Sequence, residues 1–280
     1  MAAVLTPLLG GRVERHSIGP VDLRVRVFGT QGGEPWVLLH GLGSTAFTWV
    51  PMLKELSADC RVLLPELTIQ GGTRAPHRGL NVQEASSAIA TMIERRFEGR
   101  PVTLGGISLG GWTAVRIALE RPELVDRLLL VACAGYLDQD WNRVVDLVTV
   151  QSRADAGAML EALFQRPPLR FRWGRSYVNW AFNSRHVRHV LDTIHPGDVF
   201  DAADLARITQ PTGVIWGERD GLFPPEVGRA IDAALPHSRL EVIPGCGHVV
   251  PWDCPAAANR ALRDIRDGWA GEAAGAAPPA

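Results

Sequence analysis

Short apolar segments that alternate with helix-like segments are the feature of this 280-residue chain that most restricts its fold. The apolar segments are continuous, whereas a strand with one face in water alternates apolar and polar residues, as residues 21–28 do. Strands that are apolar on both faces belong to parallel sheets that helices cover on both sides. We expect such strands, in chain order, at residues 35–39, 61–64, 101–104, 127–133, 212–216 and 240–243. The chain is therefore predicted to be an α/β protein with a mostly parallel sheet.

Helical patterns separate these strands, and one of them has a clear start signal. Asn81 precedes a helical pattern and is a typical N-cap residue. The patterns between and after the strands lie at residues 46–56, 81–97, 108–119, 225–235 and 256–267. The last segment, residues 269–280, is rich in Ala, Gly and Pro and is predicted to be disordered.

The long interval at residues 135–208 interrupts the alternation. It is too long for a plain loop and carries helical patterns at 141–150, 154–164 and 176–189. We interpret it as a helical cap inserted into an α/β core made of residues 1–134 and 209–268. Ligands of such sheets bind at the carboxyl ends of the strands, so the cap would cover the binding site.

Charge and hydropathy narrow the classes of partner. The formal net charge of −1 gives no electrostatic reason to expect nucleic acid. No uncharged apolar run reaches the roughly 18–20 residues of a membrane-spanning helix, and the first residues lack the basic start of a signal peptide. We therefore expect a cytoplasmic protein that acts on a small molecule, while the sequence leaves its oligomeric state open.

The four cysteines do not form a metal-binding pattern. Cys60, Cys133, Cys246 and Cys254 are widely spaced, and none forms a Cys-x-x-Cys pair. We interpret them as buried thiols of a reducing compartment, although a Cys246–Cys254 bridge beside His248 stays open. No cofactor and no metal are expected.

A glycine-flanked serine is the strongest candidate for a nucleophile. Gly106-Ile-Ser-Leu-Gly110 lies between an apolar strand and a helix. A serine held at a sharp strand-to-helix turn has strained backbone angles, and side chains two residues away on either side would collide there. Glycines at both positions remove the collision, so Ser108 is predicted to be the nucleophile.

A serine nucleophile needs a base, and the base needs a carboxylate to orient it. His248 follows a late strand in the flexible turn Pro244-Gly-Cys-Gly-His248, from which it can reach back over the sheet. Asp220 ends the loop after the strand at 212–216 and gives the chain order Ser, Asp, His. Asp138 is the leading alternative acid, whereas Asp253 is more typical of a helix cap.

Two backbone N–H groups are candidates for an oxyanion hole. Leu42 lies in the glycine turn His40-Gly-Leu-Gly43, and Leu109 directly follows the proposed nucleophile. Two such donors hold the oxyanion of a tetrahedral intermediate in acyl transfer. His40 itself is expected to brace the glycine turn.

These residues resemble the α/β-hydrolase family over residues 21–266. The matching stretches are His40-Gly-Leu-Gly43 with Trp49, Gly106-Ile-Ser-Leu-Gly-Gly111, Trp216-Gly-Glu-Arg-Asp220, and Gly245-Cys-Gly-His248 followed by Pro251 and Pro255. The resemblance implies an α/β-hydrolase fold with a core sheet of eight strands, an inserted cap and ester hydrolysis through an acyl-enzyme. The stretches at 104–112 and 132–136 are similar to the carboxylesterase and monoacylglycerol-lipase branches.

Other activities of this family stay open. Ser108 argues against dehalogenases and epoxide hydrolases, which need Asp there. Carbon–carbon bond hydrolases carry Gly-Pro-Gly-Ala where this chain has Gly43-Ser-Thr-Ala46, which weakens that alternative. A ligand receptor that turns over slowly is a third possibility. Many relatives also carry Asp-x-x-Gly-x-Gly-x-Ser where this chain reads Glu66 to Thr73, so the shape of the pocket is expected to differ.

The predicted cap carries a cluster of basic and aromatic residues. An inward-facing arginine could bind an acidic group of the substrate, and the aromatic rings could line an acyl pocket. The simpler interpretation has the rings packing on the core and the arginines facing water. The residues are Arg166, Arg170, Arg172, Arg175, Arg185, Arg188, Phe171, Trp173, Tyr177, Trp180 and Phe182.

Overall fold

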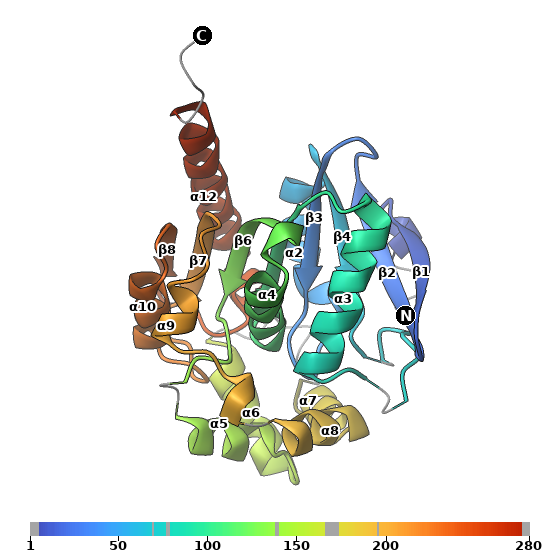
Figure 1. The fold of residues 1–280 in the computed structure, drawn as a ribbon. Coiled ribbons are helices and arrows are strands. Elements are labelled where there is room, and N and C mark those ends of the chain that lie inside the picture. The colour runs from blue at the N-terminus through green and yellow to red at the C-terminus, as the bar shows by residue number, and fades with distance from the viewer. Residues whose placement is uncertain are drawn as a thin grey trace.

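An eight-stranded sheet forms the centre of the protein in the computed structural model, which describes residues 6–68, 70–76, 79–137, 140–165, 174–194 and 196–275. The strands are β1 (Arg12–Ile18), β2 (Val21–Gly29), β3 (Glu34–Leu39), β4 (Cys60–Pro65), β5 (Val102–Ile107), β6 (Val125–Val131), β7 (Thr212–Gly217) and β8 (Ser238–Ile243). Their order is β1-β2-β4-β3-β5-β6-β7-β8, with β1 and β8 at the two edges (Figure 1). Only the pairs β1–β2 and β2–β4 are antiparallel. The predicted α/β-hydrolase fold with a mostly parallel sheet is confirmed.

Helices cover both faces of this sheet. They are η1 (Ala46–Trp49), α2 (Val50–Leu56), α3 (Val82–Phe97), α4 (Leu109–Glu120), η2 (Pro122–Leu124), α5 (Trp141–Val148), α6 (Arg153–Leu163), α7 (Gly174–Phe182), α8 (Arg185–Thr193), η4 (Pro196–Asp198), α9 (Ala202–Leu205), α10 (Pro225–Ala234), α11 (Val250–Asp253) and α12 (Pro255–Gly275). Alternate residues of one strand enter different apolar clusters. Leu128 belongs to the cluster that includes residues of α3, α4 and α10, whereas Leu129 belongs to the cluster that includes residues of α2 and α12. This is the two-sided burial that the continuous apolar strands predict.

The strand β1 has no counterpart among the segments predicted from the residues alone. Its residues are charged or polar at most positions and remain partly exposed, because β1 pairs only with β2 at the sheet edge. The neighbouring β2 departs from its predicted pattern in one respect. Arg26, expected on the wet face of an alternating strand, is fully buried.

Helices α5 to α8 lie between β6 and β7 in the chain and pack together beyond one end of the sheet, at the bottom of Figure 1. The single helical pattern expected at 176–189 is two helices in the structure. The break falls at Ser184, whose side chain accepts a hydrogen bond from Val187 N at 3.3 Å and thereby starts α8. The predicted cap of α3 is found as well, since the Asn81 side chain accepts from Glu84 N at 2.8 Å.

The last helix, α12, extends beyond its predicted end at residue 267 and reaches Gly275. Trp269 explains the extension: it is buried, and its ring lies 6.0 Å from that of Trp36, measured between centroids. The alanines that follow favour helix. The prediction of a disordered tail is therefore wrong for residues 269–275, and residues 276–280 lie outside the described part of the chain.

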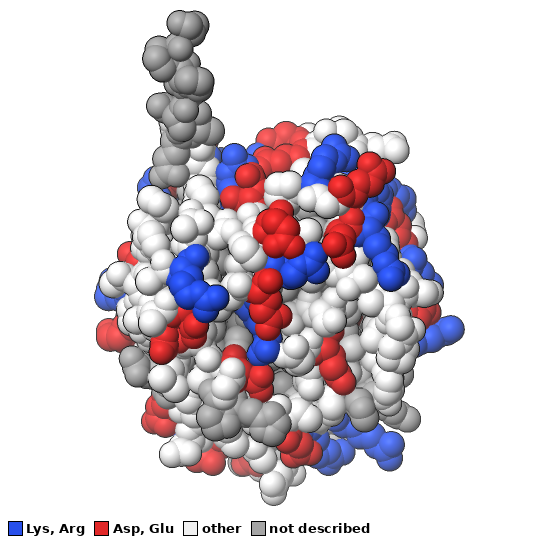
Figure 2. All heavy atoms as spheres, in the orientation of Figure 1, with Lys and Arg blue, Asp and Glu red and all other residues white. Residues whose placement is uncertain are grey.

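The surface carries charges of both signs. Figure 2 shows basic and acidic side chains interspersed over the face that carries α3 and α4. Several are paired there, as Arg116 with Asp198 at 2.9 Å and Arg121 with Glu94 at 2.9 Å. Among the described residues, no helix combines the length and the hydropathy that crossing a membrane requires.

Candidate active site

Ser108 occupies a strained turn between β5 and α4. Its backbone angles are φ 55° and ψ −120°, a conformation that costs a non-glycine residue about 1–3 kcal/mol. A Cβ on Gly106 would lie 2.1 Å from the backbone of Gly110, and a Cβ on Gly110 would lie 2.4 Å from the carbonyl oxygen of Leu39. Both flanking glycines are thus required by close backbone packing. The turn itself is held by Ser108 N donating to Val131 O at 3.0 Å.

His248 and Asp220 form a buried pair. Nδ1 of His248 lies 2.8 Å from Oδ2 of Asp220, and the two residues are 3% and 7% exposed. The other carboxylate oxygen, Oδ1, accepts from Leu222 N at 2.8 Å and from Phe223 N at 2.9 Å. Since the loop fixes one oxygen, the other is held toward the imidazole. This is the arrangement that orients a histidine base.

The alternative acids make other contacts. Glu218 accepts a hydrogen bond from Gly245 N at 2.8 Å. Asp253 accepts from Gly247 N at 2.7 Å and thereby holds the residue before His248. Asp138 lies outside the described residues.

The end of α6 is bonded to both loops that carry this pair. Gly221 N donates to Ala162 O at 3.1 Å, and Val249 N donates to Leu163 O at 3.1 Å. The helix therefore contacts the residue after Asp220 and the residue after His248.

The two candidate oxyanion donors lie beside Ser108. Leu109 is the first residue of α4, where a backbone N–H has no partner within the helix. Leu42 follows Gly41, and a Cβ on Gly41 would lie 3.2 Å from Cβ and 3.7 Å from Oγ of Ser108. The glycine turn is thus packed directly against the serine side chain, and both leucines line the same cavity as Ser108.

A buried polar network supports the glycine turn from behind, and sequence reasoning missed it. Glu66 Oε1 bonds Arg26 Nε at 2.5 Å, and Oε2 accepts from Ala46 N at 2.9 Å. Burial lowers the pKa of His40, so its ring is neutral: Nδ1 lies 2.9 Å from Gly41 O, and Nε2 accepts from Leu67 N at 2.9 Å. His40 therefore braces the turn, as expected. For the contacts of Arg26 and Glu66, the sequence carries one signal, which is Glu66 at a position where many relatives carry Asp.

Ser108 and His248 open into one cavity of about 570 Å³ between the core and helices α5 to α8. The lining comes mostly from apolar side chains, among them Trp112, Val144, Leu160 and Phe182. Ser44, Thr45, Thr48 and Tyr177 add neutral polar groups. Within the described part of the chain, no Asp, Glu, Lys or Arg side chain lines this cavity.

The model of the "Alpha/beta hydrolase family" matches residues 36–261, which is most of the chain. The chain belongs to the alpha/beta hydrolase family.

The names of relatives of this alpha/beta hydrolase indicate different activities. An uncharacterised protein of Mycobacterium tuberculosis is 28% identical over 259 residues, covering 82% of this chain and 75% of that protein. The 2-hydroxy-6-oxo-6-phenylhexa-2,4-dienoate hydrolase of Burkholderia cepacia is 27% identical over 275 residues, covering 88% and 92%. Lipase 1 of Psychrobacter immobilis is 23% identical over 236 residues, covering 79% and 73%. Lipases and carbon–carbon bond hydrolases are thus both among the relatives.

Solved structures show the same fold. A bacterial membrane phospholipase A superposes with a TM-score of 0.81 at 21% identity, covering 95% of this chain and 89% of that one. At this identity the likeness establishes the architecture of the hydrolase and nothing about its substrate.

The basic and aromatic cluster predicted for the cap of this hydrolase is only partly described. Tyr177 and Phe182 line the cavity, whereas Trp180 is 57% exposed. The described arginines of the cluster, Arg175, Arg185 and Arg188, are exposed and do not line the cavity. The other members, Arg166, Arg170, Arg172, Phe171 and Trp173, lie outside the described residues.

Proposed function

We propose that this alpha/beta hydrolase is a serine hydrolase that cleaves carboxylic esters, similar to carboxylesterases and monoacylglycerol lipases. The observation that supports this most directly is that the His248–Asp220 pair and Ser108 meet at one cavity. A strained serine at the start of a helix that shares a cavity with a carboxylate-oriented imidazole fits the machinery of acyl transfer.

The reaction follows from these positions. His248 accepts the proton of Ser108 as Oγ attacks the ester carbonyl, and Asp220 stabilises the imidazolium. The N–H groups of Leu42 and Leu109 bind the oxyanion. The intermediate collapses to an acyl-enzyme as His248 gives its proton to the leaving alcohol, and water then repeats the sequence to release the acid.

The cavity lining supports a neutral, apolar acyl group. Most of the described lining side chains are hydrocarbon, and the polar ones are uncharged apart from His248 when it is protonated. A short or medium acyl chain buries apolar surface there at about 0.8 kcal/mol per methylene. The similarity to Lipase 1 of Psychrobacter immobilis points in the same direction.

The proposal is tested by ester hydrolysis with and without the serine. We expect the wild type to hydrolyse p-nitrophenyl esters and Ser108→Ala to lose on the order of 10⁶-fold in kcat, as other triads do. Ser86→Ala, which removes a buried hydroxyl from α3, should keep wild-type turnover. Peptide mapping after a fluorophosphonate probe should find the label on Ser108. Equal turnover by the wild type and Ser108→Ala would refute the proposal.

Carbon–carbon bond hydrolysis is the second candidate. The 27% identity to the dienoate hydrolase of Burkholderia cepacia over 92% of its length favours it. The substrate in that name is a carboxylate, for which the described cavity lining holds no Lys or Arg. Turnover of that dienoate by a protein that neither hydrolyses nor is acylated by any ester would replace the first candidate with the second.

A further inference from the structure

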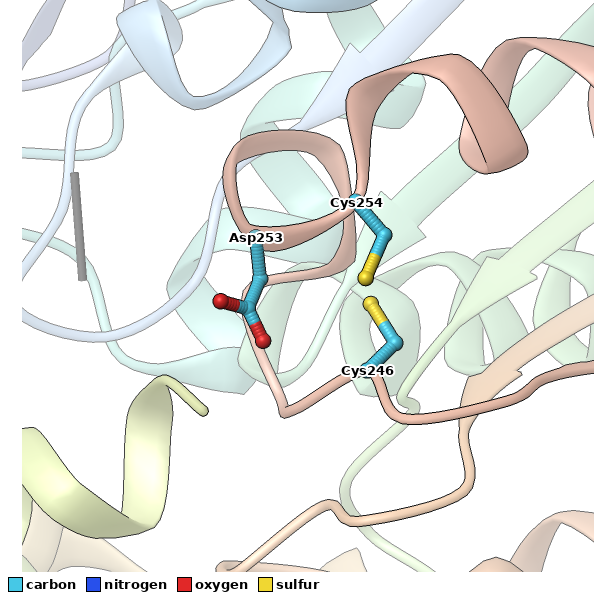
Figure 3. Close-up of side chains that lie close together, drawn as sticks. All are labelled: Cys246, Asp253 and Cys254. Atoms are coloured by element: carbon cyan, nitrogen blue, oxygen red, sulfur yellow. The ribbon is translucent and has the colours of Figure 1, made fainter. Parts of the chain in front are cut away.

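Two cysteines approach each other on either side of the proposed base. Cys246 lies in the loop between β8 and α11, two residues before His248, and Cys254 ends α11. The two sulfurs lie within 4.8 Å of each other, and neither is part of a disulfide in the structure. Figure 3 shows their Sγ atoms pointing toward one another from the loop and from the helix end.

The two thiols differ in their surroundings. Cys246 is fully buried in the apolar cluster that also holds Val250 and Leu262, and this burial raises the pKa of its thiol. Cys254 packs against the same cluster but remains partly exposed. A dissolved oxidant therefore meets Cys254 first, and Cys246 lies behind it.

A metal site at this place is less well supported. Asp253 completes a group of three candidate ligands, but its Oδ2 already accepts from Gly247 N at 2.7 Å and Gln165 N at 3.0 Å. Zinc ligation also requires thiolates, whereas the surroundings of Cys246 favour the protonated thiol. Disulfide formation uses both sulfurs and needs no ligand from Asp253.

We propose that Cys246 and Cys254 are an oxidative modification site at which hydrogen peroxide forms a reversible disulfide across the His248 loop. The Cys254 sulfur attacks peroxide, forming an S–O bond and breaking the O–O bond, with release of one water. The Cys246 sulfur then attacks the sulfenic sulfur, forming S–S and breaking S–O, and a second water leaves with the remaining thiol proton. The cysteines are oxidised, peroxide is reduced, and a dithiol restores them.

The bond closes a ring of residues 246–254 that contains His248. The sulfurs must come to about 2.05 Å, so the backbone between them shifts. A displacement of about 1 Å at a catalytic group costs on the order of 100-fold in rate, and His248, whose Nδ1 lies 2.8 Å from Asp220 Oδ2, is part of this ring. We expect oxidation to lower ester turnover by about 10–100-fold. This effect rests on the proposed function, whereas formation of the bond does not.

The experiment treats the whole protein with hydrogen peroxide, blocks remaining thiols by alkylation and maps the peptides without reduction. Cys246 and Cys254 lie on one tryptic peptide, residues 240–260, and in the wild type we expect this peptide to be about 2 Da lighter than its dithiol form until dithiothreitol reduces it. Cys60 and Cys133, both buried, serve as reference thiols in the same digest. Turnover should fall with cross-linking and return on reduction. Cys254→Ser should keep basal turnover, form no cross-link and resist peroxide.

Several results would overturn the proposal. Full alkylation of both cysteines after peroxide would disprove the bond. Stoichiometric zinc in the untreated protein, protecting both thiols until a chelator removes it, would assign the cluster to a metal. A cross-link without loss of turnover would disprove control of the His248 loop. A protein without ester turnover would refute the proposed function, while the peptide map would still decide the disulfide.

Discussion

Asp220 shows how one side chain can be fixed by its neighbours before any substrate arrives. Its Oδ1 accepts two backbone N–H groups, from Leu222 and Phe223, and its Oδ2 lies 2.8 Å from His248. All three neighbours are donors when His248 is protonated at Nδ1. A group that accepts at both oxygens is therefore required, and only a carboxylate provides it.

The first residue-scale prediction is that Asp220→Asn loses about 10⁴-fold in kcat. In one orientation the asparagine NH₂ would face the Leu222 and Phe223 N–H groups, so that donor would face donor. In the other orientation the NH₂ would donate to Nδ1 of His248 and force the wrong tautomer of the base. Glu218→Gln is the control, because the Glu218 carboxylate accepts a hydrogen bond from Gly245 N rather than from His248, and this variant should stay within about threefold of the wild type. Kinetics on a p-nitrophenyl ester measure both variants. A near-normal rate for Asp220→Asn would exclude Asp220 as the acid and return attention to Asp138.

A second prediction at this scale concerns Glu66. Glu66→Gln leaves Arg26 buried without a counter-charge, which costs about 3–5 kcal/mol. Urea unfolding should therefore show a large loss in the free energy of unfolding. Glu55→Gln, which removes an exposed partner of Arg263, should cost less than about 1 kcal/mol. Equal losses in the two variants would contradict the importance of the buried pair.

At the scale of elements, α12 illustrates how a single aromatic residue extends a helix. Trp269 packs on Trp36 of β3 and has the guanidinium of Arg127 5.9 Å from its ring. These contacts join the C-terminal half of α12 to the interior strands β3 and β6. The helix is also held near its start, because Ala258 is buried in the same apolar cluster as Trp269.

We expect Trp269→Ala to lower the free energy of unfolding by about 2–4 kcal/mol, since truncating a buried Trp removes a large apolar surface. Trp180→Ala makes the same substitution on α7, where the side chain is 57% exposed, and should cost less than about 1 kcal/mol. Urea denaturation compares the two. Similar losses would show that α12 does not depend on its terminal aromatic contact.

At the scale of the whole molecule, the cavity between the core and helices α5 to α8 is the space that the proposed function assigns to the acyl group. A chain that fills it gains about 0.8 kcal/mol per methylene, or about fourfold in kcat/KM, until the space is full. We expect kcat/KM for p-nitrophenyl esters to rise with chain length and then to stop rising. Leu160→Trp narrows the cavity and should move this limit to shorter chains, whereas Leu147→Trp, on α5 but outside the lining, should not. An unchanged length profile in Leu160→Trp would place the acyl group elsewhere.

The features of the fold that were predicted from the sequence are visible in short stretches of it. The features that were missed depend on contacts between residues far apart in the chain. Continuous apolar strands and the Asn81 cap are visible in short windows, and both appear in the structure. The edge strand β1 has little apolar signal, because only one side of it is paired. Arg26 and Glu66 are 40 residues apart, so nothing near either one reveals that they neutralise each other. His248 and Asp220 were foreseen as a pair from their loops, and their catalytic role stays a proposal.

Helix α6 lines the cavity and is also hydrogen-bonded, at its end, to Gly221 and Val249 in the loops that carry Asp220 and His248. Moving α6 away from the core would break the hydrogen bond next to Asp220 and the hydrogen bond next to His248. A bulky substrate that displaces α6 would thus loosen the loops of His248 and Asp220, which in the proposed mechanism take up the proton of Ser108. A narrower substrate would leave both loops aligned. The same two backbone hydrogen bonds would then determine both which substrate widths are accepted and whether His248 and Asp220 stay aligned.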